Sequence, residues 1–231
     1  MQCQKTKKMK SKIAILLITF IVVSAYTASA QVDEKAKKIL DELSAKTKAF
    51  TSIIANFSYT VENKEQKTNE TQDGKITIKG KKYKLEIANQ TVINDTKNTY
   101  TVLKDAKEVQ KNSATSISKD RSENIDPSNI FTMYETGFKY QFVKEEKQKS
   151  GAVYQIIKLF PNETKKRNFH TIMLTIDKVK KQIVMIKIMG KDGTDTTYNV
   201  KKFLSNTKVD DVLFALNMKS YPGYELIDLT E

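Results

Sequence analysis

Apolar side chains recur at every second position through most of this chain, and this period constrains the fold more than any other feature. The first such run is residues 53–61, and similar runs follow at 74–79 and 82–87, with Lys, Thr and Glu between the apolar residues. Because successive side chains of a strand point to opposite faces, each run predicts a strand with one apolar and one solvated face.

More segments of this kind follow along the chain, separated by turn sequences such as Asp95–Asn98 and Asp192-Gly193. They lie at residues 91–94, 99–103, 139–143, 153–159, 169–176, 183–189, 196–203 and 212–216, and residues 223–227 are expected to be a tail. The polar stretch Asn63–Asp73 predicts a long hairpin tip. The pattern therefore predicts about ten or eleven antiparallel strands in one large, curved sheet.

Two segments have a helical pattern instead. Over residues 33–50, Ala36, Leu40, Leu43 and Phe50 share one stripe, which predicts an amphipathic helix. Between Asp126-Pro127 and Gly137, the apolar residues Ile130, Phe131, Met133 and Tyr134 predict a short second helix. Such a short helix is not stable alone, so it should pack on the sheet as a lid. The predicted fold class is α+β, mainly β.

Residues 1–30 have the pattern of a signal peptide. Residues 1–12 contain five lysines and no acid, residues 13–25 are apolar, and Ala28-Ser29-Ala30 provides small residues for cleavage. The apolar run is shorter than the roughly 20 residues that span a bilayer as a helix. We expect cleavage after Ala30 and export to the periplasm.

The predicted mature chain, residues 31–231, has the length of one domain. Removing the leader and its five lysines lowers the net charge from +13 to +8 and removes Cys3, the only cysteine. The mature chain therefore has no thiol nucleophile and no thiolate metal ligand. Its lysines fit the solvated face of a sheet, or contacts with anionic lipid headgroups or an acidic partner.

No group of residues has a catalytic pattern. His170 is the only histidine, and no Gly-x-Ser-x-Gly elbow accompanies it. The adjacent pairs Glu145-Glu146 and Asp210-Asp211 would point to opposite faces of a strand. We expect no catalytic residue, no metal, no cofactor and no nucleic-acid partner. The pattern leaves open whether the apolar face encloses a cavity or an ordinary core.

Four segments, in this order, carry a family resemblance. They are the helix and Phe-containing strand at 39–57, the glycine-led strand 74–79, the strand, turn and aromatic strand at 93–100, and the Phe-rich segment with its Pro-Gly-Tyr tail at 211–226. Together with the leader, they resemble the periplasmic outer-membrane lipoprotein carriers, the LolA-like proteins. The resemblance implies an incomplete antiparallel β-barrel whose helical lid encloses an apolar cavity for acyl chains. The residues expected to line that cavity and its lid are Leu43, Phe50, Phe57, Ile76, Ile78, Tyr83, Leu85, Ile93, Tyr100, Ile130, Phe131, Met133 and Tyr134.

Such a carrier shields acyl chains from water, because burying each CH₂ group of a chain lowers the free energy by about 0.8 kcal/mol. The resemblance implies a monomer that takes acylated lipoproteins from an inner-membrane lipoprotein-releasing ABC transporter. An outer-membrane acceptor lipoprotein is a further partner, whose existence the sequence leaves open. One departure is Lys81-Lys82, where the family commonly has an Arg-Pro pair whose arginine holds the lid. The alternatives are an envelope-stress sensor or lipid-binding regulatory domain on the same scaffold, and a structural envelope protein with a filled core.

Overall fold

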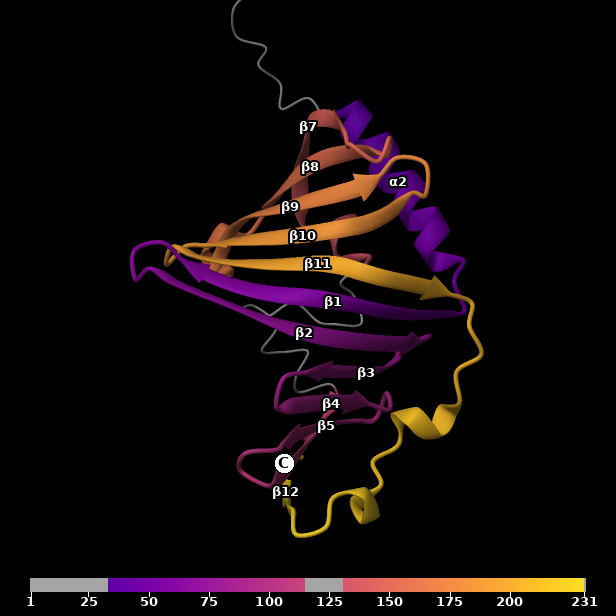
Figure 1. The fold of residues 1–231 in the computed structure, drawn as a ribbon, viewed down its shortest axis with the longest axis vertical. Helices are drawn as coiled ribbons and strands as arrows, with labels where there is room; N and C mark the ends of the chain where they lie inside the picture. Colours follow the sequence, from indigo (N-terminus) through magenta and orange to yellow (C-terminus); the bar gives the residue numbers. More distant parts are fainter. Residues whose placement is uncertain (1–32, 115–130, 231) are drawn as a thin grey trace, which may run out of the picture. The chain divides into compact units, whose positions relative to one another are not determined.

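The computed structural model describes residues 33–114 and 131–230, which belong to one compact unit, Asp33–Glu231. The leader and residues 126–130 of the predicted lid lie outside the described residues. Within them the chain is mostly β, with one α-helix, four 3₁₀ helices and twelve strands in a single sheet (Figure 1). The bounds are α2 Glu34–Lys48, β1 Ser52–Asn63, β2 Thr68–Lys79, β3 Lys82–Ile87, β4 Gln90–Asn94, β5 Asn98–Leu103, β6 Glu108–Ser113, η3 Met133–Glu135, β7 Phe138–Lys147, β8 Val153–Pro161, η4 Thr164–Lys166, β9 Phe169–Asp177, β10 Gln182–Gly190, β11 Thr194–Ser205, η5 Asp211–Phe214, η6 Met218–Ser220 and β12 Glu225–Asp228.

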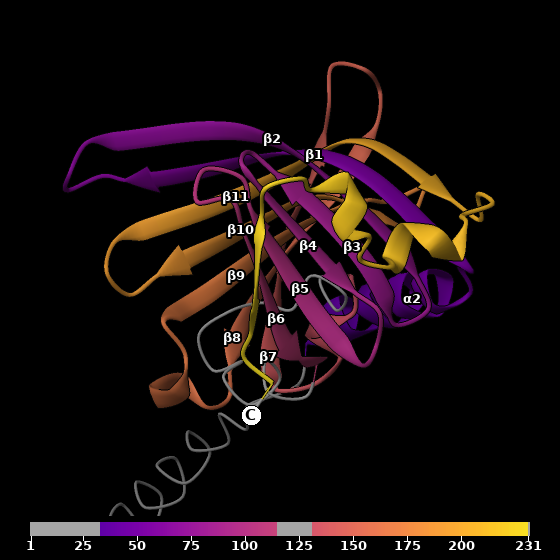
Figure 2. The same cartoon turned by 90° about the horizontal axis from the view of Figure 1, so that it is seen from below.

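The order across the sheet is β12-β6-β5-β4-β3-β2-β1-β11-β10-β9-β8-β7. The sheet is curved and open, and β12 and β7 are the two edges among the described strands (Figure 2). Neighbouring strands are antiparallel except β12, which runs parallel to β6. The predicted count was too low because β6 has a single buried apolar residue, Val109, and so lacks a period-two pattern. The run at 212–216 is mainly the 3₁₀ helix η5 and not a strand.

The segment expected to be a hairpin tip is mostly strand. β1 continues to Asn63 and β2 begins at Thr68, so the turn itself is residues 64–67. The Asn63 side-chain carbonyl accepts hydrogen bonds from the Glu65 and Gln66 amides, at 3.0 and 2.9 Å. The first six residues of β2 are exposed, so no apolar face is needed there and the sequence lacks the strand pattern.

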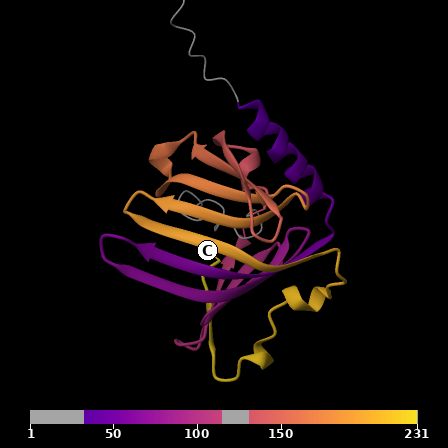
Figure 3. The same ribbon diagram turned by 45° about the horizontal axis from the view of Figure 1, so that its top comes forward.

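Helix α2 begins at an acidic cap that also fixes it to the sheet. One carboxylate oxygen of Asp33 accepts from the Ala36 amide at 2.9 Å, and the other accepts from the Phe142 amide of edge strand β7 at 2.7 Å. These donors lower the pKa of Asp33, the Ala36 amide contributing most. Ala36, Leu40 and Leu43 are buried, as the predicted stripe requires. Figure 3 shows α2 beside β7 at this end of the sheet.

The sheet has a main core on one face, which we call the inner face. The strand register identifies the residues of this face, because directly paired residues on neighbouring strands point to the same side of the sheet. One such row of paired residues crosses six strands and consists of Tyr59, Tyr198, Ile186, Leu174, Ile157 and Phe142. On the other face, the outer face, β4–β6 carry a second apolar group, in which Ile93, Val102 and Val109 are buried. The apolar surface therefore changes sides between β3 and β5.

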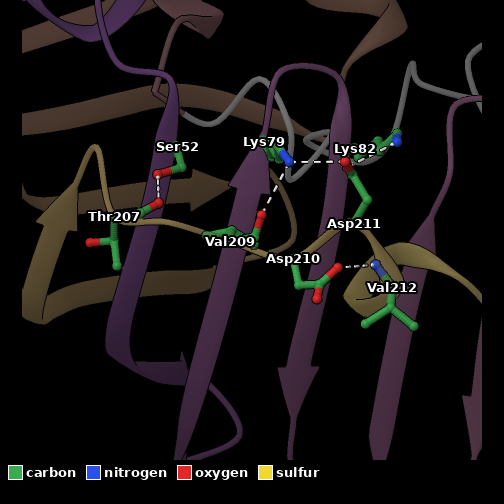
Figure 4. Close-up of polar contacts among 8 residues, drawn as sticks. All are labelled: Ser52, Lys79, Lys82, Thr207, Val209, Asp210, Asp211 and Val212. Atoms are coloured by element: carbon green, nitrogen blue, oxygen red, sulfur yellow. Dashed lines mark hydrogen bonds and ion pairs between the residues drawn. The ribbon is translucent and has the colours of Figure 1, made fainter.

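The C-terminal segment, residues 206–230, covers this second group, and we call it the strap. Its Phe214 is buried, and η5 contacts β3. Asp211 accepts from Lys79 Nζ at 3.0 Å and from Lys82 Nζ at 3.1 Å (Figure 4). The strap ends as β12, whose Asp228 pairs with Lys111 of β6 at 2.8 Å. Its path explains how Ile93, Val102 and Val109 are buried on the outer face.

Candidate functional site

The inner face is the largest apolar surface of the described chain. Its buried side chains come from α2, β1–β3, the η3 segment and β8–β10, so they converge from both halves of the sequence. They are Ala36, Leu40, Leu43, Ile53, Ala55, Phe57, Ile76, Ile78, Tyr83, Phe131, Tyr134, Ile157, Leu159, Phe169, Ile172, Leu174, Ile176, Ile183 and Ile186. The site is thus a continuous apolar face and not a cluster of polar groups.

A ring of partly exposed apolar side chains packs against this core. It includes Phe50, Tyr59, Leu85, Phe142 and Phe203, which lie on inner-face positions of the strands or at the end of α2. By register, the inner face becomes polar beyond β4, where Val92 is followed by Thr101 of β5 and then Gln110 of β6. The apolar face therefore extends from β7 to β4 and ends there.

Gly74 makes room for an aromatic ring on this face. A Cβ at Gly74 would be 2.5 Å from Cζ and 2.6 Å from Cε2 of Phe57, distances that two carbon atoms cannot tolerate. The Phe57 ring packs edge-on against Tyr198, with centroids 5.8 Å apart. The glycine that leads the predicted strand thus makes room for Phe57 on the neighbouring strand.

Two tyrosines place hydroxyl groups in this apolar setting. The ring centroids of Tyr59 and Tyr198 are 5.2 Å apart. Burial raises the pKa of the Tyr198 hydroxyl, with a smaller contribution from Tyr59, and burial raises the pKa of Tyr59 as well. Both groups therefore stay neutral at physiological pH and suit contact with an apolar or uncharged ligand.

The described helical elements pack on the inner face and on each other, and Phe131, just before η3, lies 5.7 Å between ring centroids from Phe203 of β11. Helix α2 packs on β7 and on η3. Glu135 joins η3 to α2, because its carboxylate accepts from Ser44 Oγ at 2.5 Å and pairs with Lys48 Nζ at 2.7 Å. Burial favours a higher pKa for Glu135, but these two donors outweigh it and lower the pKa. Glu135 is therefore ionised when the contact forms.

The expected lining residues divide into three groups. Leu43, Phe57, Ile76, Ile78, Tyr83, Phe131 and Tyr134 are in the main core, and Phe50 and Leu85 pack against it. Ile130 lies outside the described residues, and the backbone of Met133 begins η3. Ile93 and Tyr100 are partners of each other on the outer face, because Val92 and not Ile93 shares a face with Leu85. For these two, the inner-face expectation was wrong.

Ile93 and Tyr100 were misplaced because a short strand does not reveal which of two adjacent apolar residues points to the inner face. In β4, both Val92 and Ile93 are apolar, so alternation alone does not identify the inner residue. Sequence reasoning also omitted the second half of the face, including Ile157, Leu174 and Ile186. Their strands were predicted from alternation, and the same alternation would have identified these inner positions.

Lys82, one of the two lysines that stand where the family commonly has an Arg-Pro pair, has another contact. It lies on the outer face and pairs with Asp211 of the strap.

His170, the single histidine, has a structural contact, since its Nδ1 lies 2.8 Å from the Thr171 hydroxyl. No group of three or more His, Cys, Asp or Glu side chains that could hold a metal ion occurs within residues 33–114 and 131–230.

The described chain thus has the architecture of a single open antiparallel sheet whose broad inner face is apolar and is flanked by helix α2. Residues 26–193 match the family model described as outer membrane lipoprotein carrier protein LolA. This match covers most of the chain, which therefore belongs to the LolA-like family.

Several solved structures are similar to this chain at low sequence identity. An uncharacterised conserved protein from Thermus thermophilus is 11% identical, with a TM-score of 0.52 over 83% of this chain and 98% of that chain. A LolA superfamily protein from Nitrosomonas europaea is 9% identical, with a TM-score of 0.42 over 78% and 97%. Lipoprotein LppX from Mycobacterium tuberculosis is 14% identical, with a TM-score of 0.47 over 75% and 98%. No curated protein matches the sequence significantly.

No helix in the described part of the chain is long and apolar enough to cross a membrane.

Proposed function

We propose that this protein is a periplasmic carrier that binds the acyl chains of lipoproteins on its inner face and moves them from the inner to the outer membrane. Family membership supports this function. The observation that carries it is the extent of the continuous apolar face. The face extends from β7 to β4 and gathers buried aliphatic and aromatic side chains from both halves of the sequence.

The chemistry of the face fits a hydrocarbon ligand. Its buried residues are mainly branched aliphatic and aromatic, and its two central tyrosines stay neutral. Burying an acyl chain on such a surface gains about 0.8 kcal/mol per CH₂, and the gain needs no directional polar contact. A carrier of this kind needs no catalytic residue, so we propose a binding protein and not an enzyme.

The proposed cycle includes opening of the helical cover over an incomplete barrel. Glu135 is the residue we assign to hold that cover, since it connects η3 to Ser44 and Lys48 of α2. Lys82, in the lysine pair that stands where the family commonly has Arg-Pro, pairs instead with the strap on the opposite face. The proposed partners are acylated lipoproteins, an inner-membrane releasing ABC transporter and an outer-membrane acceptor.

A photo-crosslinking experiment tests which face binds the chains. Benzoylphenylalanine replaces Tyr59 on the inner face or its neighbour Thr60, which points to the outer face of the same strand. The mature protein is then irradiated with a triacylated lipoprotein that carries radiolabelled acyl chains. We expect labelled adducts at position 59 and background at position 60. Equal labelling at the two positions would contradict binding on the inner face.

A further inference from the structure

A second apolar surface lies on the outer face, over β8–β10, and none of the described segments covers it. Its side chains are Tyr154 and Ile156 of β8, Met173 of β9, and Val184 and Met185 of β10, all half-buried. By register they point away from Ile157 and the main core. A sheet with apolar side chains on both faces must shield each face from water. An apolar surface that stays accessible is typical of a binding site.

The surface is the floor of a groove of about 560 Å³. Three irregularities in strand pairing surround it, at Val143 of β7, Val184 of β10 and Lys201 of β11. A β-bulge bends its strand and re-aims side chains. The bulge in β10 adds Val184 to the outer face beside Met185, and we attribute the hollow to these bends.

The groove has a mixed charged border. Lys180, Lys201 and Lys202 line it, together with Glu146 and Asp177. Lys201 contacts Asp73 at 2.5 Å, and Lys180 lies 3.9 Å from the buried Asp177. A flat anionic membrane fits this arrangement poorly, because the apolar floor is recessed and the carboxylate of Glu146 stands at the border. A narrow segment with a carboxylate and an apolar side chain fits both features.

The strap shows how this protein covers an outer-face apolar surface elsewhere. There an extended segment buries Phe214, and Asp211 three residues earlier pairs with Lys79 and Lys82. The groove offers the same two elements, an apolar floor and adjacent lysines, on other strands of the same sheet. Methionine adds adaptability, since its flexible thioether fits irregular apolar partners.

We infer that the groove over β8–β10 is a docking site for an extended acidic and apolar segment of a partner protein. The site lies on the face opposite to the proposed acyl-chain surface, so both can be occupied together. It goes beyond the proposed function and does not depend on it. The partner segment carries a large apolar side chain for the Met173 and Met185 floor and a carboxylate for Lys201 or Lys202.

The test uses a peptide of this chemistry that the chain itself supplies. A fluorescein-labelled peptide copying residues 208–217 is titrated with the mature protein, and its anisotropy is followed. We expect saturable binding that Met185→Glu weakens at least tenfold and Lys202→Glu weakens severalfold. Asn69→Glu, which adds the same charge to an exposed outer-face position of β2, serves as the matched control and should leave binding unchanged.

Each other outcome overturns the inference. Absence of saturable binding, or equal affinity for wild type and Met185→Glu with unchanged circular dichroism, removes the groove as a peptide site. Met173→Leu keeps the floor apolar and should bind normally, which separates loss of the site from loss of folding. Flotation with phosphatidylglycerol vesicles that Met185→Glu abolishes would indicate a lipid surface instead. A dimer in sedimentation that the same variant dissociates would indicate a second copy of the chain.

Discussion

Phe214 gives the sharpest stability prediction, because it is the one fully buried side chain among residues 206–230 of the strap. Its side chain is 1% exposed, and Ile93, Val102 and Val109 of the outer-face group are at most 3% exposed. Replacing it with Ala removes about 150 Å² of buried apolar surface. At about 25 cal/mol per Å², this corresponds to about 4 kcal/mol, within the range of about 3–5 kcal/mol for buried Phe→Ala changes.

The loss should appear as detachment of the strap and not as unfolding of the sheet. The strap is otherwise held by half-buried side chains such as Leu213, Leu216 and Tyr221, by hydrogen bonds from Ser52 and Lys79, by ion pairs and by the short parallel strand β12. Two amides report its attachment: Glu225 donates to the Lys107 carbonyl at 2.9 Å, and Leu229 donates to the Lys111 carbonyl at 2.7 Å. A local loss of about 4 kcal/mol would accelerate their hydrogen exchange about a thousandfold, until the strap is fully open.

The matched control is Val212→Ala, two residues earlier in η5, where the side chain is 72% exposed. It should change exchange at Glu225 and Leu229 little, and the amide of Leu174 in the main core should be unaffected by either variant. If Phe214→Ala and Val212→Ala gave the same exchange rates at the two reporters, the assignment of Phe214 as the anchor would be refuted.

Three further predictions concern other contacts. Gly74→Ala should lower the free energy of unfolding in urea by about 1–3 kcal/mol, because the new Cβ overlaps the Phe57 ring. Phe57→Leu in the same chain should relieve part of this cost, and strictly additive effects of the two substitutions would contradict the overlap. Asp33→Ala should lower the unfolding free energy by about 1–2 kcal/mol through loss of the helix cap and the β7 contact, whereas Asp33→Asn should lose less. Lys111 holds the pKa of Asp228 at about 2, so the ion pair should stabilise β12 above pH about 4 and lose its effect as the pH falls toward 2. Pepsin cleavage of the strap should follow this loss, and Asp228→Asn should remove the pH step.

Much of the sheet could be predicted, because its central strands have a clear choice of inner residue. In β1 and β8–β10, alternation identified the strands, and the order of segments identified the family. In β4 the adjacent Val92 and Ile93 made the phase ambiguous, and the correct phase depends on a strap more than 100 residues later. A contact that distant has no signature in a local period.

The polar contacts were the least predictable part of the site. The link from Glu135 to Ser44 and Lys48 joins segments 91 residues apart, so no motif contains it. Lys81-Lys82 stands where the family commonly has an Arg-Pro pair, and strand register puts Lys82 on the outer face beside Asp211. The outer groove escaped prediction for a similar reason, since bulges at Val184 and Lys201 are not visible as departures from alternation.

Release of a lipoprotein from a membrane tests the central claim most directly. Inner-membrane vesicles that contain a triacylated lipoprotein and the lipoprotein-releasing ABC transporter are incubated with ATP and the mature protein, and the soluble fraction is separated by size. Acyl-chain carriage predicts a soluble one-to-one complex, with labelled acyl chains that crosslink at position 59 and not at position 60. If the protein stays folded and no lipoprotein leaves the membrane, or if the complex forms equally well when the chains have been removed, the account is contradicted.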